Sequence, residues 1–100
     1  MVKKIEPIHP GEILLEDFME PLALSSAELA RNLGVPTNRI SQVLQKKRNV
    51  SVDTALRLER FFGVSADTWL NLQQHYDLEV GKNTLWPEIE RTVKPKGEVA

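Results

Sequence analysis

Gly, Pro and Ser residues divide the chain into short segments, and this punctuation limits its fold more than any other feature. Between these breaks, apolar residues recur every three or four positions, which is the period of a helix with one buried face. Alternation with a period of two, typical of a half-buried strand, does not extend over a useful length. The pattern predicts an all-α fold of five short helices over about residues 10–79.

The first predicted helix opens at Pro10, because the N–H that proline lacks would have no partner in a first turn. It ends near Glu20, since the residue before Pro21 is biased away from helical conformation. Its buried stripe is predicted from apolar residues at four-residue spacing: Leu14, Phe18 and Leu22.

Serines and glycines mark the boundaries of the other helices. A serine side chain caps an N-terminus by accepting a hydrogen bond from a free N–H, and glycine ends a helix by adopting the left-handed conformation. The predicted caps are Ser25 or Ser26, Ser51 and Ser65, and the predicted stops are Gly34 and Gly63. A third helix is expected from about residue 36 to 46, and the fourth has a predicted stripe of Val52, Ala55, Leu58 and Phe62.

The sequence predicts one domain over residues 9–80, preceded by an arm of residues 1–8 and followed by a C-terminal extension, residues 81–100. We interpret Gly81-Lys82-Asn83 as a break in helical structure. A short sixth helix follows over residues 85–93, with Pro87 at its start, and residues 94–100 are expected to form a frayed tail.

The distribution of charge says more than its total. The 100 residues carry a net charge of −1, which taken alone argues against a nucleic-acid partner. Counted by segment, however, the net charge is −4 over residues 1–30, +5 over residues 31–60 and −2 over residues 61–100. Salt screens remote acids beyond about 8–10 Å, so a confined basic segment can still attract phosphate. Its densest point is Lys46-Lys47-Arg48.

Several other classes of protein are disfavoured. The absence of cysteine excludes a disulfide scaffold, a thiolate metal site and a cysteine nucleophile. No apolar run approaches a membrane span and no signal-peptide core is seen, so we expect a soluble, cytoplasmic protein without membrane contact. His9-x-x-Glu12 and His75 do not make a convergent ligand set, and no phosphate-binding glycine loop or nucleophile–base pair is present. We therefore expect no catalytic residue, metal or cofactor.

The second and third helices carry the functional signal. The short turn at Gly34 that joins them is typical of a helix-turn-helix, whose second helix enters the DNA major groove. This third helix of the chain has no acidic residue, and its polar side chains can hydrogen-bond to base edges. Base readout is predicted for Thr37, Asn38, Arg39 and Gln42. Phosphate contact is predicted for Ser25, Ser26, Ser41, Gln45, Lys46, Lys47 and Arg48.

Several groups of residues carry a family resemblance. Residues 29–35 (Leu-Ala-Arg-Asn-Leu-Gly-Val) with residues 40–44 (Ile-Ser-Gln-Val-Leu) resemble lambda-repressor-like (XRE) helix-turn-helix domains. Three further segments are similar to those of HigA-type antitoxins: residues 9–14 (His-Pro-Gly-Glu-Ile-Leu), residues 55–58 (Ala-Leu-Arg-Leu) with Phe62-Gly63, and the segment 69–78, from Trp-Leu-Asn-Leu-Gln to Tyr-Asp-Leu. The resemblance covers about residues 8–80 and implies a five-helix lambda-repressor-like helix-turn-helix domain with a short C-terminal extension.

The resemblance also implies a function. HigA-type proteins bind and neutralise a HigB-type toxin, an mRNA-cleaving ribonuclease, and repress their own operon as homodimers on a palindromic operator. A dimer suits a protein that recognises double-stranded DNA. The second helix of each helix-turn-helix, called the recognition helix, enters a major groove, and the two must lie about 34 Å apart to reach successive grooves. From the residues we predict a dimer contact through Leu70, Tyr76 and Leu78. The acidic first helix is one candidate surface for a basic toxin.

At two positions the chain differs from the family pattern. Gln45-Lys46 stands where such domains often have Asn-Gly, so either the third helix runs longer or Lys46 takes a left-handed conformation. Pro36 stands where many relatives have Ser or Thr, which shifts the expected N-cap to Thr37.

Two other functions remain as alternatives on the sequence. A stand-alone transcriptional repressor without a toxin would use the same DNA chemistry. A module that binds only protein is disfavoured by the acid-free third helix and by the basic segment around it.

Overall fold

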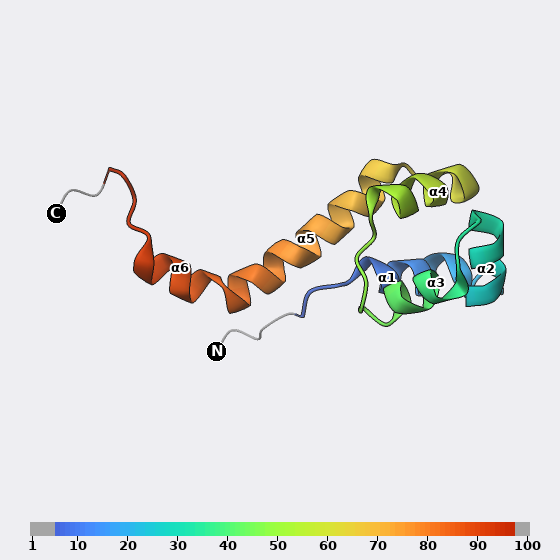
Figure 1. Ribbon diagram of the computed structural model, residues 1–100, viewed down its shortest axis with the longest axis horizontal. Helices are drawn as coiled ribbons and strands as arrows, with labels where there is room; N and C mark the ends of the chain where they lie inside the picture. Colours follow the sequence, from blue (N-terminus) through green and yellow to red (C-terminus); the bar gives the residue numbers. More distant parts are fainter. Residues whose placement is uncertain (1–5, 98–100) are drawn as a thin grey trace.

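The computed structural model describes residues 6–97, and within these residues it is helical throughout, with no strand (Figure 1). The elements are α1 (Pro10–Ile13), the π-helix η1 (Leu14–Met19), α2 (Ser26–Leu33), α3 (Thr37–Leu44), α4 (Val52–Phe62), α5 (Ala66–Thr84) and α6 (Trp86–Thr92). The predicted all-α fold is confirmed. The predicted arm and tail lie partly outside the described residues, and the described positions 6–9 and 93–95 have no regular structure.

The helices α1 to α4 and the beginning of α5 gather into one body, which holds the hydrophobic core (Figure 1). Trp69 of α5 is the largest fully buried side chain, and it ties this helix to the body. The other buried hydrophobic residues are Leu14, Met19, Leu29, Ala30, Leu33, Ile40, Val43, Val50, Ala55 and Leu58.

The first helical segment is wider than the α-helix that the sequence predicts. After one α-helical turn the chain continues as η1, in which hydrogen bonds join residues five apart, as from Glu20 N to Leu15 O at 2.9 Å. Leu14 and Met19, five residues apart, therefore share the buried face, with Phe18 partly buried beside them. The prediction that Leu22 belongs to the stripe is wrong, because it lies beyond the helix and is exposed.

The predicted caps and stops are confirmed. The side chains of Ser25, Ser51 and Ser65 each accept from a backbone N–H in the first turn of the helix that follows. Gly34 and Gly63 adopt the left-handed conformation, with φ of 71° and 80°. Within α4 the prediction for Val52 is wrong: its side chain is exposed. Thr54 is buried instead, and its hydroxyl lies 3.3 Å from that of the N-cap serine.

The predicted break at residues 81–83 is wrong, because α5 continues to Thr84. One glycine in a helix costs only about 0.5–1 kcal/mol, which is too little to end it. The real break lies at Leu85, two residues before Pro87. Proline has no N–H to bond to the carbonyl of Asn83, and its ring crowds that carbonyl. The predicted short sixth helix is confirmed as α6.

The outer part of the molecule projects away from the body. Figure 1 shows α5 leaving the body and α6 lying at its far end. The radius of gyration is 17.3 Å, against about 13 Å for a compact chain of this length. No residue of α6 is buried. These helices therefore stand outside the core of the protomer.

Helix α3 is fixed by a close backbone contact with α1. Gly11 lies so near the end of α3 that a Cβ atom placed on it would stand 2.2 Å from the carbonyl oxygen of Val43. No other residue type fits this space without moving the backbone of one of the two helices. The glycine of the His9-Pro10-Gly11-Glu12 motif is thus required by packing.

The substitution Gly11→Ala is expected to lower the free energy of unfolding by about 1–3 kcal/mol, the usual cost of overpacking a tight contact. Urea unfolding followed by circular dichroism measures it. Gly81→Ala is the matched control, since its Cβ would meet nothing closer than Leu85 Cδ1 at 3.8 Å. In the interior of α5 this alanine should stabilise by about 0.5–1 kcal/mol. Equal effects of the two substitutions would contradict the proposed packing role of Gly11.

Candidate nucleic-acid interface

The helices α2 and α3 form a helix-turn-helix, and a side chain of α4 stabilises its turn. The turn is closed by a hydrogen bond from Val35 N to Ala30 O at 3.0 Å. Arg57 of α4 supports it, because its Nη1 donates to the carbonyl oxygen of Leu33 at 2.8 Å. Ile40 and Val43 bury one face of α3 and leave the opposite face to solvent. The turn and the recognition helix are therefore positioned as one unit.

The exposed face of α3 begins with two of the predicted base-reading residues. Thr37 and Asn38 lie in its first turn, both are exposed, and neither side chain has a hydrogen-bond partner within residues 6–97. Thr37 is the first helical residue, and Pro36 occupies the N-cap without a side-chain bond. The expected shift of the N-cap to Thr37 is therefore wrong. Both side chains remain available to a base edge.

Arg39, the third predicted base-reading residue, is engaged by another side chain. Its Nη1 lies 2.5 Å from Oδ2 of Asp53, and the same oxygen accepts from Nε of Arg57 at 2.9 Å. Hydrogen bonds from Arg57 and then from Arg39 hold the pKa of the Asp53 carboxyl below its usual range, so this group is ionised at neutral pH. The structure thus turns Arg39 toward α4. Sequence reasoning missed Asp53, because the two residues are 14 positions apart.

The fourth predicted base reader, Gln42, is also held within the chain. Nε of Arg48 donates to its Oε1 at 2.8 Å. Arg48 comes back along α3 because the chain reverses at Lys46, which has a left-handed φ of 64°. Lys46 N donates to Val43 O and Lys47 N to Gln42 O, which is the Schellman arrangement of a helix end. Of the two alternatives left by the missing glycine, the structure shows the left-handed Lys46.

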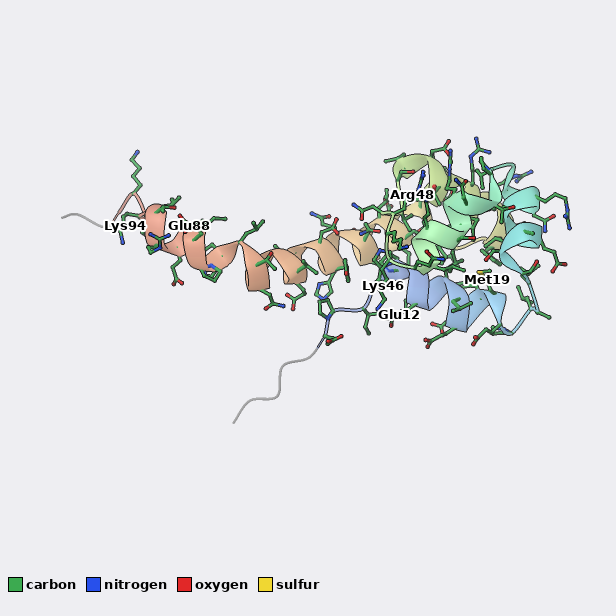
Figure 2. All side chains as sticks on the ribbon, turned by 60° about the horizontal axis from the view of Figure 1, so that its bottom comes forward. Glu12, Met19, Lys46, Arg48, Glu88 and Lys94 are labelled. Carbon is green, nitrogen blue, oxygen red and sulfur yellow. The ribbon has the colours of Figure 1, made fainter. Side chains whose placement is uncertain are left out.

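The basic triplet after α3 is split by this reversal. Nζ of Lys46 lies 2.6 Å from Oε1 of Glu12, and Figure 2 shows this pair side by side, with Arg48 apart from it. The hydrogen bond and charge of Glu12 raise the pKa of Lys46. Lys47 is exposed, and within the described chain no carboxylate forms an ion pair with it. Among the three cations of this triplet, Lys47 is therefore the one without an intramolecular side-chain partner in residues 6–97.

The remaining predicted phosphate contacts have different surroundings. Ser25 caps α2 through a capping box, in which its Oγ accepts from Glu28 N and its own N donates to Glu28 Oε1, both at 3.1 Å. These bonds lower the pKa of Glu28, whose negative charge then stands at this helix end. Ser41 donates its hydroxyl to the carbonyl oxygen of Thr37 at 3.2 Å. Gln45 is exposed at the end of α3, and Ser26 is half-buried.

His9 joins α1 to α5 beside this interface. It is buried and caps α1 by accepting from Gly11 N on Nδ1 at 2.9 Å, and its ring meets Tyr76 edge to face at 4.8 Å between centroids. Burial, and then the charge of Lys46, lower the pKa of His9. The cap itself requires an unprotonated Nδ1, so the neutral form is the one that fits. The histidine of the opening motif is therefore structural.

The predicted dimer residues occupy three different environments. Leu70 packs partly against the core of its own protomer, and Tyr76 packs on His9. Leu78 is 54% exposed and lines an open groove of about 450 Å³ together with Leu85, Trp86 and Ile89. All four of these apolar side chains are exposed. The apolar spacing between residues 78 and 89 was its signal in the sequence.

Over residues 6–97, no helix has both the length and the apolar character needed to cross a membrane. In the same residues, no three His, Cys, Asp or Glu side chains lie close enough together to hold a metal ion.

The fold and the acid-free face of α3 define a helix-turn-helix protein, and the helix-turn-helix family model matches residues 15–69. Virulence-associated protein I of Dichelobacter nodosus is 47% identical over 75 residues, which are 75% of this chain and 69% of that protein.

Solved structures narrow the class. An addiction module antidote protein of the HigA family from Coxiella burnetii matches with 43% identity and a TM-score of 0.85, covering 91% of this chain and 99% of that one. The Pseudomonas aeruginosa antitoxin HigA, solved with the higBA promoter, matches with 39% identity and a TM-score of 0.87, covering 90% and 98%. The chain belongs to the HigA family of helix-turn-helix antitoxins.

The substitution Asp53→Asn tests whether the ion pair with Asp53 keeps Arg39 from contacting DNA. Released from its carboxylate, Arg39 should contact DNA phosphate, so binding to random-sequence DNA should tighten and its salt dependence steepen by about one unit of slope. Fluorescence anisotropy at several salt concentrations measures both. In an Arg39→Ala background the same substitution should lose this gain. An equal gain in both backgrounds would show a general charge effect instead.

Proposed function

We propose that this protein is the antitoxin of a toxin–antitoxin pair in the bacterial cytoplasm. It represses its own operon by binding an operator as a homodimer, and it neutralises a HigB-type ribonuclease. The observation that carries the proposal is the polar face of α3, which is free of acidic residues and lies opposite the buried Ile40 and Val43. A related antitoxin of the same fold was solved with its promoter.

Operator recognition is supported by the placement of α3. Thr37, Asn38 and Gln42 stand on its exposed or half-exposed side, and side chains of these types hydrogen-bond to base edges in the major groove. Lys47 lies exposed just beyond the helix end, which supports a contact with the DNA backbone. Phosphate contacts of this kind set register and affinity, whereas the α3 side chains set the sequence.

Toxin binding is supported by an acidic surface on η1. Glu16, Asp17 and Glu20 are exposed, and none of them forms an ion pair with another described residue. Glu12, which is the fourth acid of this segment, is already paired with Lys46. A ribonuclease that handles mRNA presents a basic surface, which such an acidic patch attracts. The patch lies on an element distinct from α3, so one protomer can offer separate surfaces to DNA and to toxin.

Dimer formation is supported by the projecting helices. The groove formed by Leu78, Leu85, Trp86 and Ile89 exposes apolar side chains that the core of the protomer does not cover. Exposed apolar groups of this size are characteristic of association surfaces. A second copy of the chain offers the same apolar face, and a twofold dimer buries one such face against the other.

The function is tested with the gene pair and its upstream DNA. The purified protein should shift the DNA upstream of its own gene in a gel assay and leave unrelated DNA unshifted at the same concentration. When a tagged copy is expressed with the product of the adjacent gene, a small basic ribonuclease should copurify and its mRNA cleavage should be blocked. DNA binding without such a partner would establish a stand-alone repressor. Failure to bind upstream DNA would contradict the repressor role.

The substitution Leu78→Glu should convert the dimer to a monomer, because it places a charge in the apolar groove. Sedimentation equilibrium measures the state of assembly. Operator affinity should fall by about a hundredfold, since the two half-sites are then bound independently. Leu56→Glu is the matched control: Leu56 is 53% exposed on α4, away from the groove. If both variants remain dimeric, the interface lies elsewhere on the molecule.

A further inference from the structure

We propose that Arg48 positions the side chain of Gln42 so that the recognition helix selects guanine rather than adenine at the base pair it contacts. This inference rests on the proposed binding of operator DNA. It concerns how one side chain of α3 reads a base, and it starts from the hydrogen bond between Arg48 Nε and Gln42 Oε1 at 2.8 Å.

The chemistry of the two groups decides which end of the Gln42 amide faces Arg48. An arginine nitrogen has hydrogens to donate and no acceptor capacity, so it can bond only to the amide oxygen and never to the amide nitrogen. Oε1 therefore points at Arg48, and Nε2 with its two N–H groups points away from it. No side-chain or backbone acceptor within residues 6–97 takes a hydrogen bond from this Nε2.

The backbone holds Arg48 in place for this role. Lys46 adopts a left-handed φ of 64°, and Lys47 N donates to the carbonyl oxygen of Gln42 itself at 2.8 Å. The turn that ends α3 thus carries Arg48 back over the residue whose side chain it bonds. The arrangement does not depend on a long flexible loop, because residues 42 and 48 are joined through the closed helix end.

A glutamine held in this way reads bases differently from a free one. A free glutamine pairs with adenine in two bonds, accepting from N6–H and donating to N7. The bond from Arg48 uses one of the two lone pairs of Oε1 and holds this oxygen toward Arg48, which leaves the two Nε2 donors as the free side of the Gln42 amide. Guanine offers two acceptors in the major groove, O6 and N7, whereas adenine offers N7 alone and adds an N6 donor. Presentation of the Nε2 donors therefore favours guanine.

The experiment is selection of binding sites from a randomised DNA library, sequenced for the wild-type protein and for single variants. The Gln42→Ala variant identifies the relevant base pair as the one at which preference disappears. At that position the wild-type protein should prefer guanine. Arg48→Ala should lower the ratio of guanine to adenine by about tenfold, because the freed Oε1 can accept from adenine N6.

Two further variants separate positioning from charge and from folding. Lys47→Ala removes a neighbouring positive charge and should weaken binding to all sequences alike, with base preference unchanged. Arg48→Met removes the guanidinium but keeps the apolar stem of the side chain, and it should reproduce the effect of Arg48→Ala. A thermal melt confirms that each variant is folded.

The inference is overturned if the wild-type protein prefers adenine at the position that depends on Gln42. It is also overturned if both Arg48 variants weaken binding uniformly without changing that preference, which would make Arg48 a phosphate contact alone. A wild-type protein that selects no sequence at all would remove the proposed operator binding itself, and this result is distinct from the other two.

Discussion

The structure depends on the contact between Gly11 and the carbonyl oxygen of Val43, where the backbones of α1 and the recognition helix meet without a side chain between them. This contact brings Glu12 within reach of Lys46 and places His9 beside Tyr76 of α5. Because close-packed backbones have no soft side chain to absorb a shift, the end of α3 is fixed relative to two other helices. The orientation of the DNA-reading face follows from this packing.

Intramolecular pairing changes what the basic middle third can offer to DNA. Asp53 engages Arg39, Glu12 engages Lys46, and the amide of Gln42 engages Arg48. Exposed pairs of this kind add little to folding stability, so their main effect is on which groups remain for a ligand. On α3 and just beyond it, Thr37, Asn38, the Gln42 amide nitrogen, Gln45 and Lys47 remain without a side-chain partner among residues 6–97. This surface therefore offers a ligand a few side chains with defined orientation, in addition to net charge.

The outer helices project from the body because the core is small. The body closes around Trp69 near the start of α5, and the rest of that helix has no further core to join. Its apolar residues instead face a groove with Leu85, Trp86 and Ile89 of the α5–α6 junction. A protomer of this shape presents the polar face of α3, an acidic surface on η1 and an apolar groove at the α5–α6 junction, each on a different element.

The sequence by itself determined the helices of the body, their serine caps and glycine stops, and the helix-turn-helix, because caps and helical periodicity are local properties of the chain. The sequence pattern predicted a break at Gly81, but the helix breaks at Leu85, before Pro87. One glycine destabilises a helix less than a proline does, because proline lacks the N–H and its ring clashes with the preceding turn. Only the tertiary structure decided the partners of Arg39, Lys46 and His9. Those contacts join α3 to α4, α3 to α1 and α1 to α5, and they depend on how the core packs, which no local pattern specifies.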